Sequence, residues 1–114
     1  MGFVVGHEVT HAFDDEGRHY DGLGALRNWW TSNDSMNFGD RAACFVKKYG
    51  ALSSSGGQHI NGILTLGENL ADNGGLRLAY MAFLADAHEK GIDLDRVQRG
   101  YTPRQEFFLS FAQY

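Results

Sequence analysis

The stretch "VVGHEVTHAFDDEG", residues 4–17, places two histidines four positions apart in a segment with helical spacing. We expect a helix over Gly2 to Phe13, because its apolar residues recur at the intervals of a helical stripe. His7 and His11 then project from one helical face about one turn apart. The stretch is therefore either an ordinary polar helix or half of a metal site.

Glu8 directly follows His7 and completes the pattern H-E-x-x-H. In zinc metalloproteases the two histidines of this pattern bind the metal, and the glutamate acts as the general base. Two imidazoles at this spacing can reach one tetrahedral ion at roughly 2.0–2.1 Å. A pattern with three fixed positions also arises by chance, where the histidines only cap or pack, so the motif alone leaves both interpretations open.

A second motif, "GENLAD" at residues 67–72, offers the missing half of such a site. A catalytic zinc takes three protein ligands and keeps one position open. Glu68 is a candidate third ligand, and Asp72 lies four residues later on the same helical face. Like charges at that spacing repel each other, which a nearby dication would relieve. A second carboxylate also suits a metal-bound histidine, whose other nitrogen nearly always donates to a carboxylate or carbonyl.

Two further helices are indicated by their capping residues and apolar faces. Serine and asparagine residues after the tryptophan pair suit the start of a helix, and apolar positions from Phe38 to Tyr49 give it an apolar face. Thr102 is a candidate N-cap for a last helix, with Pro103 at its first position.

The longest helical candidate runs from Leu66 to about Lys90. We expect a kink or a break at "NGG", residues 73–75, because each glycine in a helix interior costs roughly 1 kcal/mol. Residues 14–26 and 53–63 are rich in turn-forming residues and are expected to be loops. The sequence therefore predicts a mainly helical chain with long loops.

Composition bounds the class of protein. The chain has 114 residues, the length of one small domain, and its hydrophobic fraction of 43% provides material for a core. The net charge is −4 and no run of Lys or Arg exists, which argues against a nucleic-acid partner. The longest apolar-leaning stretch, residues 76–87, contains Arg77 and Asp86 and is too short to span a bilayer, so no membrane segment is expected.

Two further features leave alternatives open. Cys44 is the only cysteine, so it is either a buried free thiol or half of a bridge to something outside this chain, and composition favours the thiol. Several aromatic side chains suit a peptide-binding wall or core packing, and we favour the core because aromatics dominate small cores. These are Trp29, Trp30, Phe107, Phe108 and Phe111.

Taken together, these motifs resemble the M13 family of zinc endopeptidases, the neprilysin and endothelin-converting-enzyme family. The matching stretches are "VVGHEVTHAFDDEGR", "NWWT", "GQHINGILTLGENLADNGGLRLAY" and "FFLSFAQ", in family order and at family spacing. The pairing of "GENLADNGG" with "HEVTHAFDD" is specific to this family. The resemblance implies that His7, His11 and Glu68 bind one zinc ion per chain, that Glu8 is the general base, and that Asp72 assists the proton chemistry.

The resemblance also implies roles for carboxylates around the histidines. Asp72 is expected to hold the ring of His7. Asp14 or Asp15 is expected to do the same for His11, although a turn-capping role suits them equally. Cys44 aligns with a cysteine that forms a disulfide in the family, with its partner upstream of this chain.

The function implied is hydrolysis of internal peptide bonds by a zinc-activated water, in a thermolysin-like (gluzincin) fold. Compared with the family, residues 1–114 lack an upstream edge strand that pairs with substrate and a downstream histidine and arginine. We therefore expect a partial C-terminal catalytic domain, with peptide substrates and the remainder of that domain as partners. The alternative is a truncated, catalytically inert zinc-binding module. The family is mostly membrane-anchored or exported, which suggests a location outside the cytosol.

Overall fold

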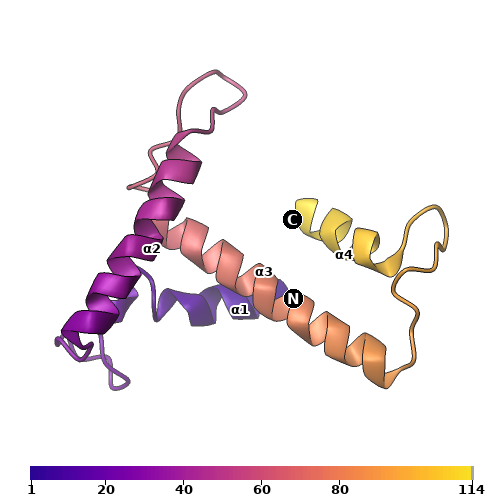
Figure 1. The fold of residues 1–114 in the computed structure, drawn as a ribbon, viewed down its shortest axis with the longest axis horizontal. Coiled ribbons are helices and arrows are strands. Elements are labelled where there is room, and N and C mark those ends of the chain that lie inside the picture. The colour runs from indigo at the N-terminus through magenta and orange to yellow at the C-terminus, as the bar shows by residue number, and fades with distance from the viewer. Residues whose placement is uncertain (114) are drawn as a thin grey trace. The chain divides into compact units, whose positions relative to one another are not determined.

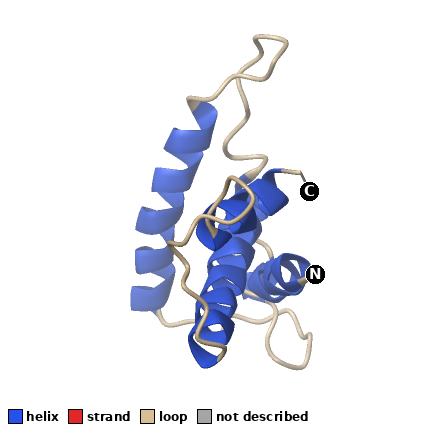
Figure 2. Cartoon of the chain, turned by 90° about the vertical axis from the view of Figure 1, so that its right-hand side faces the viewer, coloured by secondary structure: helices blue, strands red, loops and turns tan. Residues whose placement is uncertain are grey.

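The computed structural model describes residues 1–113 and is helical (Figure 1). Figure 2 shows helices joined by loops and no strand within that range. The elements in chain order are α1 (Gly2–His11), the short 3-10 helix η1 (Gly17–His19), α2 (Ser32–Gly50), α3 (Leu66–Glu89) and α4 (Pro103–Ala112). The prediction of a mainly helical chain with long loops is confirmed.

The chain divides into two compact units, Met1–Leu76 and Arg77–Tyr114, with the boundary inside α3. The first unit contains α1, α2 and the first half of α3, so it holds both sequence motifs. In the second, Phe83 of α3 stacks on Phe107 of α4 at a ring-centroid distance of 5.2 Å, and Tyr80 of α3 contacts Phe107 in a tilted arrangement at 5.1 Å. No helix in the described part of the chain is long and apolar enough to cross a membrane.

Capping boxes fix the starts of α2 and α4. The Thr31 hydroxyl accepts a hydrogen bond from the Asp34 N–H, and the Asp34 carboxylate accepts one from the Thr31 N–H. The cap of α2 is therefore Thr31, and the expectation of a serine or asparagine cap is wrong. Thr102 caps α4 in the same way, with Pro103 in its first turn as predicted.

Helix α3 continues through Asn73-Gly74-Gly75, so the expected break is wrong. The two glycines lie against α1. A Cβ atom on Gly75 would stand 2.5 Å from the backbone nitrogen of His7, and one on Gly74 would meet the side chain of Thr10. The close packing that glycine permits there outweighs its low helix propensity.

The core is smaller than the composition suggests. The only buried hydrophobic residues in the described range are Ala42, Leu66, Ala71 and Ala87. Trp30, Phe107 and Phe111 are partly buried, in keeping with a packing role. Trp29 and Phe108 are 45% and 46% exposed, so the expectation that they pack in the core is wrong.

Cys44 lies on α2 and is exposed, so the expectation of a buried thiol is also wrong. An exposed side chain leaves the alternative, a bridge to something outside this chain, as the remaining prediction.

The capping of α2 can be tested directly. Thr31→Ala removes the hydroxyl that accepts the Asp34 N–H and should lower the free energy of unfolding by about 1 kcal/mol. Ser32→Ala and Asn33→Ala serve as controls, because neither side chain makes a capping bond, and both should change stability by less than half as much. Chemical denaturation monitored by circular dichroism measures these differences. An equal loss in Ser32→Ala would contradict the assignment of the cap.

Candidate metal centre

Helix α1 brings two imidazole nitrogens together. His7 and His11 stand one turn apart, with ring centroids 4.6 Å apart and ring planes at 86°. Their Nε2 atoms are 3.0 Å from each other. The spacing predicted from the sequence is therefore realised on one face of α1.

Helix α3 adds a carboxylate to this pair. Glu68 Oε2 lies 3.4 Å from His7 Nε2 and 3.8 Å from His11 Nε2. One potential ligand atom from each of the three residues lies within 4.8 Å of the other two. Two motifs separated by more than fifty residues in the sequence thus converge on one point.

Carboxylates orient both rings from the opposite side. Asp72 Oδ1 lies 2.9 Å from His7 Nδ1, and Asp14 Oδ2 lies 2.6 Å from His11 Nδ1. An ionised carboxylate can only accept hydrogen bonds, so each Nδ1 carries the donated proton. The Nε2 atom of each neutral ring is then left as an acceptor that faces Glu68.

Asp14 fills both roles that the sequence left open. Its Oδ2 bonds the ring of His11, while its Oδ1 accepts the N–H groups of Glu16 and Gly17 at 2.9 and 2.6 Å. The residue is only 5% exposed. Asp15 makes neither contact, and its Oδ1 is buried without a hydrogen-bond partner. Asp14 therefore orients His11 and caps the turn.

The pKa shifts agree with this pairing. The hydrogen bond to Asp14 raises the pKa of His11 above its ordinary value against an opposing effect of burial, and the charge of Glu68 adds to the rise. Burial raises the pKa of Asp14, but the hydrogen bonds from His11 and from two backbone N–H groups outweigh it, so that pKa is lowered. Asp14 is therefore ionised at neutral pH and accepts the hydrogen bond from His11 Nδ1–H.

The donor set fits a tetrahedral cation such as zinc. Ligands at roughly 2.0–2.1 Å from one tetrahedral ion stand roughly 3.3 Å from each other, and the three separations here are 3.0, 3.4 and 3.8 Å. Two nitrogen lone pairs and a carboxylate oxygen this close repel one another, and a cation between them turns that repulsion into attraction.

The cluster is open on its carboxylate side. The side chain of Glu68 is 68% exposed, against 17% for His7 and 30% for His11. Glu8 is also exposed on α1, and its charge contributes to raising the pKa of His11. Solvent can therefore reach the point where the donor atoms converge.

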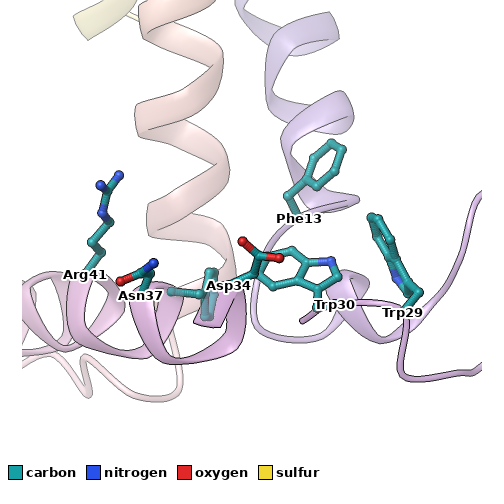
Figure 3. A pocket seen from close by; sticks show the side chains of 7 residues that line it. Phe13, Trp29, Trp30, Asp34, Asn37 and Arg41 are labelled. Carbon is teal, nitrogen blue, oxygen red and sulfur yellow. The ribbon is translucent and has the colours of Figure 1, made fainter. Parts of the chain in front are cut away.

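A hollow of about 540 Å³ in the same unit is a separate feature. Figure 3 shows Phe13 just after the end of α1, and Trp29 and Trp30 in the loop that precedes α2. Asp34, Asn37 and Arg41 lie along α2 itself. The residues around the candidate metal position, His7, His11, Asp14, Glu68 and Asp72, do not line it. Its lining residues are Phe13, Trp29, Trp30, Asp34, Asn37, Phe38 and Arg41.

Comparison with known proteins shows the family of this chain. The family model described as "Peptidase family M13" matches residues 1–114. The chain belongs to peptidase family M13. This confirms the resemblance carried by the two motifs.

Relatives of this M13 chain are much longer than it is. It is 50% identical over 113 residues to endothelin-converting enzyme 1 of Bos taurus and 47% identical over 122 residues to neprilysin of Mus musculus. Each match covers 99% of this chain and 15% of the relative. The crystal structure of the Mycobacterium tuberculosis zinc metalloprotease Zmp1 superposes with a TM-score of 0.85 at 36% identity, over 97% of this chain and 17% of that one. The helical M13 fold is thereby confirmed.

The sequence motifs identified the donors but not the residues that allow them to meet. Gly74 and Gly75 lie where α3 packs against α1, and Gly67 lies against the turn that follows α1. The stretch "GENLADNGG" contains all three glycines, but helix propensity alone predicts a break at the glycine pair. Three glycines on one helical face, next to a motif that needs a partner helix, could have indicated that α3 crosses α1 at close range.

The ring orientation makes a spectroscopic prediction. At alkaline pH, where both rings are neutral, His7 and His11 should carry their proton on Nδ1, because Asp72 and Asp14 accept it there. Nitrogen-15 NMR of the imidazoles distinguishes the two tautomers. Asp72→Ala should abolish the preference of His7 for the Nδ1–H tautomer. His11 serves as an internal control in the same spectrum. A proton on Nε2 of either ring in the unsubstituted chain would contradict the arrangement.

Proposed function

We propose that this M13 chain forms the zinc-binding core of a metalloendopeptidase that hydrolyses internal peptide bonds. The observation that supports this most is the convergence of two imidazole Nε2 atoms and one Glu68 oxygen, each imidazole being oriented by a carboxylate. Family membership supports the same class of reaction, since the similar structure from Mycobacterium tuberculosis is described as a zinc metalloprotease.

In this proposal His7, His11 and Glu68 hold one zinc ion per chain. Three protein ligands and a remaining open position are typical of catalytic rather than structural zinc. The exposed side of Glu68 provides that opening. When bound, zinc would supply Lewis acidity that acidifies water and polarises the scissile carbonyl.

Glu8 acts as the general base. It is exposed beside His7 on α1, where its carboxylate can take a proton from the attacking water and return it to the departing amine. Asp72 holds His7 with Nε2 free as a ligand and raises the basicity of that nitrogen. Asp14 does the same for His11.

The proposed substrates are peptides, and the remainder of an M13 catalytic domain is the proposed partner of this chain. A second candidate function is a zinc-binding module that does not hydrolyse peptides. The two candidates share the metal and differ only in catalysis.

One experiment with two readouts tests both candidates. Zinc titration against a chromophoric chelator should give one tightly held ion per chain, and His11→Ala and Glu68→Gln should each weaken binding by on the order of a hundredfold or more because each removes a ligand. Glu89→Gln is a matched control, since it removes an exposed carboxylate at the other end of α3. A folded chain without specific zinc would contradict the proposal.

Cleavage of an internally quenched peptide by the same samples supplies the second readout. Glu8→Gln should keep the zinc affinity and lose on the order of 10²–10⁴ in rate, because only the proton acceptor is removed. Activity unchanged in Glu8→Gln would contradict its role as the base. Zinc binding without any cleavage by the unsubstituted chain would favour the inert module.

A further inference from the structure

We propose that three glycines of α3 are positioning residues that set the distance between the histidine pair and Glu68. This inference rests on the proposed zinc function. Gly67, Gly74 and Gly75 occupy positions i, i+7 and i+8, so they share one side of the helix. Glu68 and Asp72 lie between them in the sequence.

Gly75 contacts the backbone of a proposed ligand. A Cβ atom there would lie 2.5 Å from His7 N, 2.8 Å from Phe3 O and 2.9 Å from His7 Cα. Folded proteins do not contain such short contacts to Cβ, and backbone atoms cannot rotate away as a side chain can. Any residue larger than glycine would therefore displace α1 at His7, and the His7 ring would move relative to Glu68 and Asp72.

Gly74 contacts the residue that lies between the two histidines. A Cβ atom there would collide with Oγ1 and Cγ2 of Thr10 and would lie 3.0 Å from its Cβ. The Thr10 hydroxyl donates to Gly6 O at 2.7 Å, which fixes the side chain in this position. The contact is thus a steric limit on how closely α1 approaches α3.

Gly67 contacts the carboxylates that follow α1. A Cβ atom there would lie 3.1 Å from Asp15 Oδ1 and 3.2 Å from Asp14 Oδ2, the oxygen that bonds His11. The glycine next to Glu68 therefore leaves room for the group that orients His11. The contact at Gly67 is tighter than a usual Cβ contact but shorter than 3.0 Å to neither oxygen, so the steric limit is strongest at Gly74 and Gly75.

A pair of glycine substitutions separates positioning from helix propensity. Gly75→Ala and Gly39→Ala both place alanine in a helix interior, but a Cβ atom on Gly39 meets nothing within 4 Å. Both changes raise helix propensity equally. Gly75→Ala should weaken zinc affinity by on the order of tenfold to a hundredfold, whereas Gly39→Ala should leave it unchanged. The visible spectrum of bound Co²⁺ should lose intensity in Gly75→Ala alone, because the tetrahedral ligand geometry is distorted. Equal affinities and equal spectra in the two variants would overturn the proposal.

A compensating pair keeps the test decisive if Gly75→Ala does not fold. Gly74→Ala should weaken zinc binding, and adding Thr10→Ala should recover part of the loss because it removes the two atoms in collision. Thr10→Ala alone is the reference for the double variant, and it should bind zinc more tightly than Gly74→Ala because it creates no collision. No recovery in the double variant would overturn the proposal.

A second measurement distinguishes failure of the proposed zinc function from failure of the proposed packing contact. If the unsubstituted chain binds no zinc, the midpoint of thermal unfolding of the same four metal-free proteins decides the steric contact. A lower midpoint in Gly74→Ala that rises again with Thr10→Ala supports the crossing, and independent effects of the two substitutions overturn it.

Discussion

The close approach of α1 to the first half of α3 is the constraint on which the site depends. His7 and His11 are fixed relative to each other by one turn of helix, but Glu68 reaches them only because glycines line the crossing. A Cβ atom at Gly75 would already collide with the His7 backbone. The arrangement of the donors is therefore a property of helix packing as much as of the motif residues.

Electrostatics then explains why a cation would stabilise this group of donor atoms. Asp72 and Asp14 accept hydrogen bonds from the Nδ1–H groups, which leaves two Nε2 lone pairs and a Glu68 oxygen directed at the same point. The apolar core is small and consists largely of alanine, so little hydrophobic burial offsets this repulsion. A bound metal would contribute its binding free energy to folding.

Local geometry explains which features could be predicted from the sequence. The spacing of each motif and the Thr102-Pro103 start follow from the helix repeat and from capping, which need no partner. The continuity of α3 through Gly74 and Gly75 could not be predicted, because the packing against α1 that outweighs their low propensity is not encoded locally. The exposure of Trp29 and Cys44 depends in the same way on what lies beside them in space.

The most direct test of this account is a crystal structure of the zinc-loaded chain with anomalous diffraction measured on both sides of the zinc absorption edge. We predict one strong anomalous peak per chain, bounded by His7 Nε2, His11 Nε2 and a Glu68 carboxylate oxygen. A peak at Cys44 or at another histidine, with no density between the two motifs, would contradict the claim that they form one site.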